Sequence, residues 1–145
     1  MRNEKKNPLS HLFVATKGFI VHEGKVLVVR ESTTYSDGTL PGVFGLVGGR
    51  MNPDENVEES LHREIREETG LTVILKKPLW VSEWRPVVRN EQWHIVGIFF
   101  VCTSNTAHVT LGPDHSFYKW IVPANYHHEN IVEDEHAVFE AYLTK

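Results

Sequence analysis

Three glutamates have a spacing that could form a metal site, because Glu64, Glu67 and Glu68 stand at positions i, i+3 and i+4. On a helix this spacing puts the three side chains on adjacent turns of one face. Carboxylates held so close repel each other by roughly 0.2–0.5 kcal/mol per pair, and a divalent cation would turn that repulsion into coordination. Ligands made only of oxygen select a hard ion over zinc, which prefers imidazole and thiolate groups. The spacing therefore indicates a Mg²⁺ site, with Mn²⁺ as an alternative ion.

The helix that must carry these glutamates is expected over 57–69. Asn56 and Glu59 are placed to form a capping box at its N-terminus, and Gly70 stands where a left-handed residue ends a helix. A Glu-rich helix face can also be simply solvated, with neighbouring arginines pairing with its carboxylates. The glutamates alone therefore leave both interpretations open.

The rest of the chain is expected to form strands and one more helix. Two β-branched runs around Glu23-Gly24 predict a hairpin over 18–30, and the Ser, Thr, Asp, Gly and Pro content of 31–42 predicts a loop. Apolar residues at helical spacing predict a closing amphipathic helix over 131–143. Further strands are expected at 43–47, 71–75, 79–84, 92–103 and 117–122. Strands interleaved with two helices predict an α/β or α+β fold in which helices pack on a sheet.

Length and composition fit a single domain over residues 1–145, with 1–10 as a flexible N-terminal segment. A hydrophobic fraction of 41%, with no apolar run near the roughly 18 residues of a membrane span, excludes membrane insertion. Lys and Arg number 15 against 19 Asp and Glu, and this net charge of −4 argues against binding to extended nucleic acid. The first residues lack the pattern of a secretory signal, so we expect a cytoplasmic protein. The single cysteine, Cys102, is expected to be buried among apolar neighbours.

A longer pattern surrounds the glutamates. Gly49 is separated by five residues from Glu55, which is separated by seven from Arg63, and the pattern continues through the glutamates to Gly70 and Leu71. This spacing resembles the Nudix box at each defining position, and the order of hairpin, glycine pair, helix and later strands is similar to that of a Nudix domain. The resemblance implies an α/β/α sandwich around a mixed sheet. It also implies a metal-dependent hydrolase that cleaves the pyrophosphate linkage of a nucleoside diphosphate derivative, such as a nucleoside triphosphate, ADP-ribose or a nucleotide sugar.

The resemblance assigns Glu64, Glu67 and Glu68 to the metal and adds the carbonyl of Gly49 as a further ligand. Glycine at this point allows the backbone to approach the ion and the start of the helix closely. Arg63 is expected to hold a carboxylate in orientation, by pairing with Glu67 or with the glutamate that lies between the glycines and the helix. A plain surface ion pair would have the same spacing.

Hydrolysis also needs a general base, and cations for the leaving phosphate. Glu68 and Asp114 are the candidates for the base, since within the family this role moves between a box glutamate and an acidic residue on a later loop; Asp114 could equally be an ordinary turn residue. Arg30 and Arg50 are candidate phosphate contacts, although either could be solvated. The chain departs from the common family pattern at Val47, where many members have proline, and this bears on loop geometry more than on chemistry.

The identity of the substrate is less constrained than the reaction. Pro86 lies fifteen residues beyond Leu71, a spacing similar to that of ADP-ribose enzymes of the family. Oxidised or ordinary nucleoside triphosphates stay open. Several aromatic residues could stack on a base, but aromatic residues in strands more often belong to the core. These aromatic residues are Phe44, Trp80, Trp84 and Trp93.

Two other functions stay open at this point. A sensing module could keep the fold and bind a nucleotide without cleaving it, although such modules usually lose the carboxylates that this chain retains. An isomerase acting on an allylic diphosphate would need a cysteine in the pocket, so the placement of Cys102 distinguishes this hypothesis from the others. His127, His128 and His136 have no cysteine partner, and we expect them to face solvent and not to bind zinc. A homodimer is a further option.

Overall fold

The computed structural model describes residues 11–32 and 42–144. The expected flexible segment 1–10 and most of the expected loop 31–42 lie outside the described residues. Within the two described ranges, no helix has the length and apolar character needed to cross a membrane.

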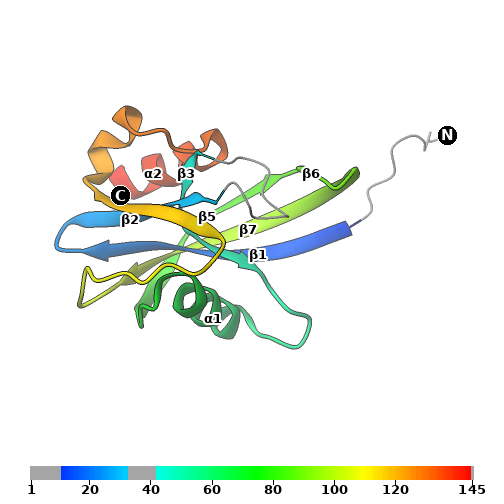
Figure 1. The fold of residues 1–145 in the computed structure, drawn as a ribbon, viewed down its shortest axis with the longest axis horizontal. Coiled ribbons are helices and arrows are strands. Elements are labelled where there is room, and N and C mark those ends of the chain that lie inside the picture. The colour runs from blue at the N-terminus through cyan, green and yellow to red at the C-terminus, as the bar shows by residue number, and fades with distance from the viewer. Residues whose placement is uncertain (1–10, 33–41, 145) are drawn as a thin grey trace.

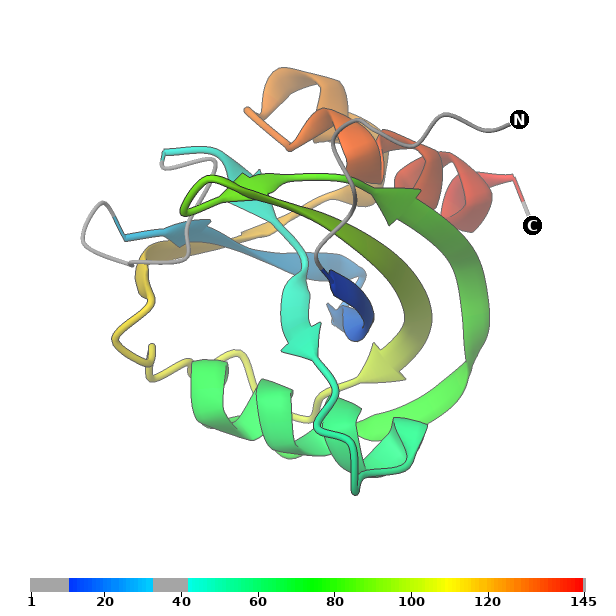
Figure 2. The same cartoon turned by 90° about the vertical axis from the view of Figure 1, so that its right-hand side faces the viewer.

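A strongly curved mixed sheet forms the middle layer of the fold, and helices cover both of its faces (Figure 1 and Figure 2). The main path of the sheet runs β3-β2-β1-β7-β5, with β4 on β1, β6 on β7 and β8 on β2. Only β1 and β7 pair in parallel; the other pairs among the described strands are antiparallel. The strands are β1 (His11–His22), β2 (Lys25–Glu31), β3 (Phe44–Gly45), β4 (Val47–Arg50), β5 (Ile74–Trp84), β6 (Val87–Val88), β7 (Glu91–Thr103) and β8 (His115–Ile121).

The helices lie on opposite faces of this sheet. Helix α1 (Val57–Thr69) covers one face, and α2 (His136–Leu143) covers the other together with two 3₁₀ turns, Pro123–His128 and Glu133–Glu135 (Figure 1). The predicted α/β sandwich with a mixed central sheet is therefore confirmed.

Alternation of side chains along β1 separates two hydrophobic cores, because successive residues of a strand point to opposite faces. Phe19 packs on the α2 side with Phe139, and the next residue, Ile20, packs on the α1 side with Leu61 and Ile65. All five of these side chains are fully buried. Each helix is thus fixed to the sheet by apolar burial, at about 1.5–3 kcal/mol for each large side chain removed from water.

The elements with strong local signals form as predicted. Asn56 caps α1, accepting from the amide of Glu59 at 2.9 Å while the Glu59 side chain accepts from the Asn56 amide at 3.0 Å. Gly70 ends the helix with φ +74°, a left-handed value that suits glycine. The predicted hairpin joins β1 to β2 through Glu23 and Gly24, both with positive φ. The strands expected at 92–103 and 117–122 are confirmed as β7 and β8.

The structure corrects several boundaries. Strand β1 begins at His11, well before residue 18, because parallel pairing with β7 holds its half-exposed first part, where Leu12 is largely solvent-exposed. The strands expected at 71–75 and 79–84 are one strand, β5, in which register shifts near Leu75 and Pro78 break the side-chain alternation. Strand β6 was not predicted at all.

The segments around Leu46 and Glu135 also differ from expectation. The strand expected over 43–47 is divided at Leu46, whose amide donates to Glu135 at 2.8 Å. The closing helix begins at His136 and not at 131, because Glu133–Glu135 form a separate 3₁₀ turn. This turn brings the Glu135 carboxylate into the interior.

Candidate active site

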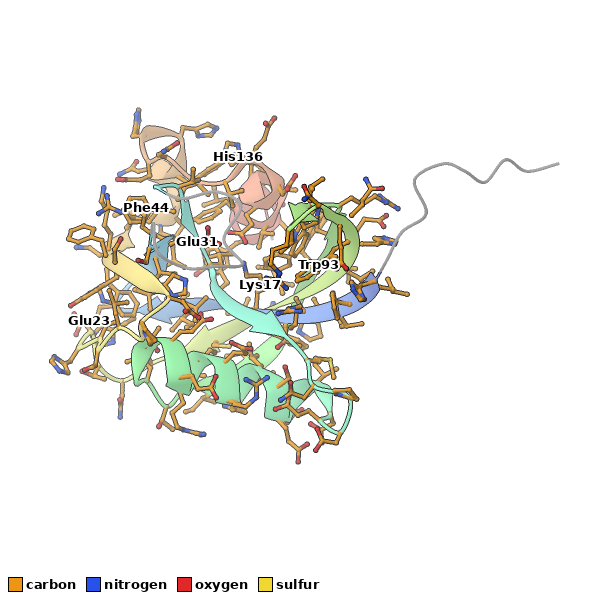
Figure 3. The ribbon with its side chains drawn as sticks, turned by 45° about the vertical axis from the view of Figure 1, so that its right-hand side comes forward. Lys17, Glu23, Glu31, Phe44, Trp93 and His136 are labelled. Carbon is orange, nitrogen blue, oxygen red and sulfur yellow. The ribbon has the colours of Figure 1, made fainter. Side chains whose placement is uncertain are left out.

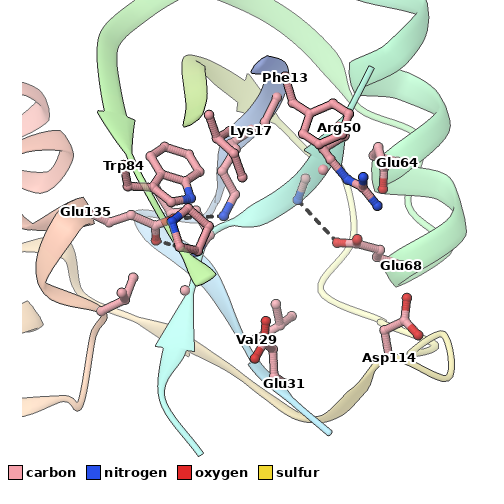
Figure 4. Close-up of a pocket in the computed structure, with 18 of the residues that line it drawn as sticks. Phe13, Lys17, Val29, Glu31, Arg50, Glu64, Glu68, Trp84, Asp114 and Glu135 are labelled. Carbon is pink, nitrogen blue, oxygen red and sulfur yellow. Dashed lines mark hydrogen bonds and ion pairs between the residues drawn. The ribbon is translucent and has the colours of Figure 1, made fainter. Parts of the chain in front are cut away.

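A cavity of about 570 Å³ opens between α1 and the α2 side of the molecule. Residues from β1, β4, α1, β5, β7 and the 3₁₀ turn before α2 line it. In the close-up, Glu64, Glu68 and Asp114 lie on one side of this space and Trp84 and Glu135 on the other, with Lys17 beside Glu135 (Figure 4). The cavity therefore joins the predicted metal site to a second group of polar residues.

Two of the predicted carboxylates, Glu64 and Glu68, stand against the glycine pair. The amide of Gly48 donates to Glu68 Oε1 at 3.2 Å. A Cβ built on Gly49 would lie 2.7 to 2.8 Å from the carboxylate of Glu64, so only glycine leaves room for that carboxylate. The third carboxylate, Glu67, also lines the cavity, but its side chain is 61% exposed and pairs with Arg63 at 3.2 Å.

Arg63 pairs with three acidic residues and orients them. It forms a close ion pair with Glu55 through its Nε, and its Nη2 donates to the other Glu55 oxygen at 3.0 Å. Its Nη1 lies 3.2 Å from Glu64 and from Glu67, and Nη2 also donates to the carbonyl of Arg50 at 3.3 Å. The hydrogen bond from Arg63, helped by the amide of Asn52, lowers the pKa of Glu55 to about 2. Arg63 thus ties the loop after the glycines to the carboxylates of α1.

The electrostatics of the carboxylate pair fit a bound cation. Burial first, and then the charge of Glu64, raise the pKa of Glu68 well above its ordinary range. Burial also raises the pKa of Glu64, and the two side chains hydrogen bond to each other. Two half-buried carboxylates in contact favour a shared proton or a cation between them.

The donor set is oxygen only, as Mg²⁺ and Mn²⁺ prefer. As they stand, however, no group of three or more His, Cys, Asp or Glu side chains among the described residues is placed to hold an ion. Glu64 and Glu67 both pair with Arg63 Nη1, whereas Glu68 accepts the amide of Gly48. The Glu64 and Glu68 carboxylates beside Gly49 are the part of the predicted set that fits the ion directly.

The structure brings Asp114 to the cavity, as expected for a second candidate base. Its backbone carbonyl accepts from the amide of Ser32 at 2.8 Å, which fixes the turn before β8. The adjacent His115 also lines the cavity, and burial lowers its pKa. His115 Nδ1 is buried without a hydrogen-bond partner, the one such side-chain atom among the described residues.

The two candidate phosphate contacts are placed differently. The Arg50 guanidinium lies 4.7 Å from the ring centre of Phe13 and 4.6 Å from that of Trp93, and all three residues line the cavity. Figure 4 shows Arg50 pointing toward Glu64 and Glu68. Arg30 instead lies over the rings of Phe44 and Phe117, and it is not among the residues that line the cavity.

The predicted aromatic residues divide in the same way. Trp84, Trp93 and Phe44 line the cavity, whereas Trp80 does not and is 42% exposed. Phe44 and Trp93 are also buried, so each of them belongs to the core and also lines the cavity. Pro86, the residue with the suggestive spacing, lines the cavity as well.

The remaining predictions concern the cysteine and the histidines. Cys102 is fully buried in the core beneath α1, as predicted, and is not among the cavity residues. His127 and His128 are exposed, as predicted. His136 is half-buried, and its Nε2 lies 3.0 Å from the carbonyl of Ile131, so the expectation that it faces solvent is wrong.

Sequence reasoning missed an ion pair inside the cavity, between Lys17 of β1, which is labelled in Figure 3, and Glu135. Burial lowers the pKa of Lys17, but the charge and hydrogen bond of Glu135, with the more distant Glu68 and Glu31, outweigh it and leave the pKa raised. Lys17 is therefore charged at neutral pH. The residues are 118 positions apart, so no local spacing could have indicated the pair.

Comparison with known proteins agrees with this geometry. The family model described as the NUDIX domain matches residues 12–142. The nucleoside triphosphatase NudI of Klebsiella pneumoniae is 31% identical over 112 residues, which cover 70% of this chain and 76% of that protein. NudI of Escherichia coli O1:K1 is 29% identical over 104 residues, covering 65% of this chain and 72% of that protein. The crystal structure of a MutT protein from Methanosarcina mazei superposes with a TM-score of 0.80 at 26% identity, over 90% of this chain and 92% of the other. The chain belongs to the Nudix family and is one of its pyrophosphohydrolases.

Proposed function

We propose that this protein hydrolyses the phosphoanhydride chain of a nucleoside triphosphate with the help of Mg²⁺ or Mn²⁺. The observation that carries the proposal is the pair of half-buried carboxylates, Glu64 and Glu68, held against Gly48-Gly49 at one side of a cavity of about 570 Å³. Cavities of this size are typical of small-molecule sites. Two curated relatives are named nucleoside triphosphatases, which favours this substrate class over ADP-ribose and nucleotide sugars.

The residues divide the work of hydrolysis between them. Glu64, Glu68 and the carbonyl of Gly49 would hold the ion, and Glu67 would join them after leaving Arg63. A divalent ion bound there would offset the negative charge of the phosphate oxygens and favour attack by water. Arg50, which lies against the rings of Phe13 and Trp93 and lines the cavity, is a candidate contact for a phosphate oxygen.

A general base must accept a proton from the attacking water. Glu68 is one candidate, because its carboxylate lines the cavity beside the glycine pair. Asp114 faces the same cavity from the turn before β8 and is the second candidate. Replacing each in turn separates the two, because loss of the base lowers kcat and shifts the pH profile.

The proposal is tested by incubating the protein with Mg²⁺ and nucleoside triphosphates, ADP-ribose or nucleotide sugars, and measuring phosphate and nucleotide products. We expect nucleoside triphosphates to be cleaved, and the Glu67→Gln and Glu68→Gln variants to lose most turnover while staying folded. Glu58→Gln is the matched control, because Glu58 is exposed on the same helix and does not line the cavity. Full turnover in both site variants, or cleavage of ADP-ribose alone, would contradict the proposal.

The alternative functions gain no support from the site. The buried Cys102 lies outside the cavity, so it cannot act as the acid of an isomerase there. A purely sensing module would have no need for the complete set of box carboxylates, which the chain retains.

A further inference from the structure

The ion pair between Lys17 and Glu135 occupies the side of the cavity away from α1. Lys17 Nζ lies 2.8 Å from Glu135 Oε2, and the two side chains are 17% and 4% exposed. Glu135 Oε1 accepts the amide of Leu46 at 2.8 Å, which fixes the orientation of the carboxylate. A Cβ on Gly45 would lie 3.2 Å from the same oxygen, so the glycine leaves the carboxylate its space. Three segments far apart in sequence therefore hold one charged pair in place.

A buried ion pair seldom stabilises a fold more than an apolar pair of similar size would, because both charges lose their hydration. This pair also keeps hydrogen-bonding capacity for a ligand. Lys17 has three N–H donors, and Glu135 is its one hydrogen-bond acceptor among the described residues. Each Glu135 oxygen can accept a second hydrogen bond. The cavity thus presents a group that only donates next to a group that only accepts.

An aromatic wall stands beside the pair. The ring centre of Trp84 lies 6.0 Å from Lys17 Nζ, and Trp84 lines the same cavity. A Cβ on Gly97 of β7 would lie 2.6 Å from two carbons of the indole, so the ring rests directly on the strand. Figure 4 shows Trp84, Lys17 and Glu135 together, across the cavity from Glu64 and Glu68. A planar, weakly polar group would find an apolar surface and a donor–acceptor pair at this end.

We propose that Lys17 and Glu135 read the hydrogen-bonding edge of the substrate's nucleobase, with Trp84 as the surface along its ring. This inference rests on the proposed function, which places the phosphates at Glu64 and Glu68 and so directs the nucleoside to the other end of the cavity. In keto bases the exocyclic atom accepts and the neighbouring ring nitrogen donates, whereas amino bases have the opposite order. A donor and an acceptor held at fixed positions therefore bind a base with one order and not a base with the other. The Lys17–Glu135 pair thereby discriminates keto bases from amino bases.

The sharpest test compares UTP with CTP, because they have nearly the same size and differ at this edge. We expect wild-type kcat/KM values for the two to differ by about 10-fold to 100-fold, the range for one hydrogen bond to a charged group. The double variant Lys17→Met/Glu135→Gln leaves no unpaired charge in the interior, and its Gln can still accept the Leu46 amide. In this variant the ratio should fall to within about threefold or reverse.

A second ion pair supplies the matched control. Lys119 and Glu129 lie 2.5 Å apart outside the cavity lining, so Lys119→Met/Glu129→Gln should keep the wild-type ratio. Circular dichroism and Tm establish that each variant is folded. Should the Lys17 double variant not fold, Lys17→Arg keeps the charge but changes the donor geometry, and it must change the UTP to CTP ratio.

Three results would overturn the inference while leaving the proposed function intact. They are a wild-type protein that cleaves UTP and CTP equally well, variants that lose activity on both with the ratio unchanged, and a Lys119/Glu129 control that loses the ratio as well. A wild-type protein that cleaves no nucleoside triphosphate, but does cleave another diphosphate, would instead refute the proposed function. The two failures are therefore distinguishable in one set of assays.

Discussion

Replacing Glu68 by Gln should remove the stabilisation of the protein by Mg²⁺ while leaving the metal-free fold intact. Glu68 Oε1 accepts the Gly48 amide, and the oxygen of a Gln amide can keep this bond. Burial and the charge of Glu64 both oppose the charged form of Glu68 and raise its pKa, so a neutral amide of the same shape suits this place in the metal-free protein. The variant therefore loses a ligand without losing a structural contact.

The size of the effect follows from binding linkage. A ligand present at 100 times its Kd stabilises the folded state by about 2.7 kcal/mol. For a domain of this size each kcal/mol raises Tm by roughly 2–4 °C, so saturating Mg²⁺ should raise the wild-type Tm by roughly 5–11 °C. With one of the two carboxylates beside the glycine pair replaced, Glu68→Gln should show a shift below about 2 °C at the same Mg²⁺ concentration.

The assay is a thermal melt of the wild-type protein, Glu68→Gln and Glu58→Gln across a Mg²⁺ titration, with EDTA as the metal-free reference. Glu58 is exposed on the same helix, so its variant should keep the wild-type shift. A Glu68→Gln protein that gains as much from Mg²⁺ as the wild type would refute the assignment of this carboxylate to the ion. A Glu58→Gln protein that loses the shift would show that the helix charge as a whole, and not the Glu64–Glu68 pair, attracts the cation.

Three further predictions concern the pH dependence of stability, Arg63 and Cys102. The pKa of Glu68 is raised above its unfolded value near 4.5, so the folded protein binds this proton more tightly. The metal-free Tm of the wild type should therefore fall relative to that of Glu68→Gln as pH rises from about 4.5 through the raised pKa, and a constant difference in Tm between the two proteins would contradict this. Arg63→Lys should lower kcat/KM by about 10-fold to 100-fold and raise the Mg²⁺ needed for half-maximal rate, whereas Arg66→Lys on the exposed side of α1 should change neither. Burial raises the pKa of Cys102 to about 12, so a thiol reagent should label it only in denaturant, and labelling of the native protein at the rate of a free thiol would disprove its burial.

The parts of the fold that could be predicted are those specified by residues close together in sequence. Helix α1 has its capping box and its terminal glycine within a few residues of its ends, and tertiary contacts did not move either boundary. The turn at Glu23-Gly24 is local in the same sense. Strand β5 could not be predicted as one element, because its bulges shift the side-chain alternation from which strands are predicted.

The same division applies to the site. The spacing of Glu64, Glu67 and Glu68 places three carboxylates near one another on any helix, and the box extends this to Gly49. The spacing could not show that Arg63 pairs with Glu55 and with two of these glutamates at once, because that depends on where the loop with Glu55 lies. Nor could it show that Arg30 stays outside the cavity, among aromatic rings contributed by β3 and β8.

Lys17 did leave a signal in the sequence, although a strand expected to begin at residue 18 excluded it. With β1 extended to His11, alternation puts Lys17 on the same face as Ala15 and Phe19, which is the face that packs toward α2. A lysine on an inward face needs a buried acidic partner, and this requirement points to a carboxylate somewhere on the elements that cover that face. Which carboxylate it is depends on the 3₁₀ turn that carries Glu135 and on the divided strand at Leu46, and neither has a local pattern. The residues we assign to base recognition thus depend on contacts between distant segments, while the carboxylates of the proposed metal site are set out along a single helix.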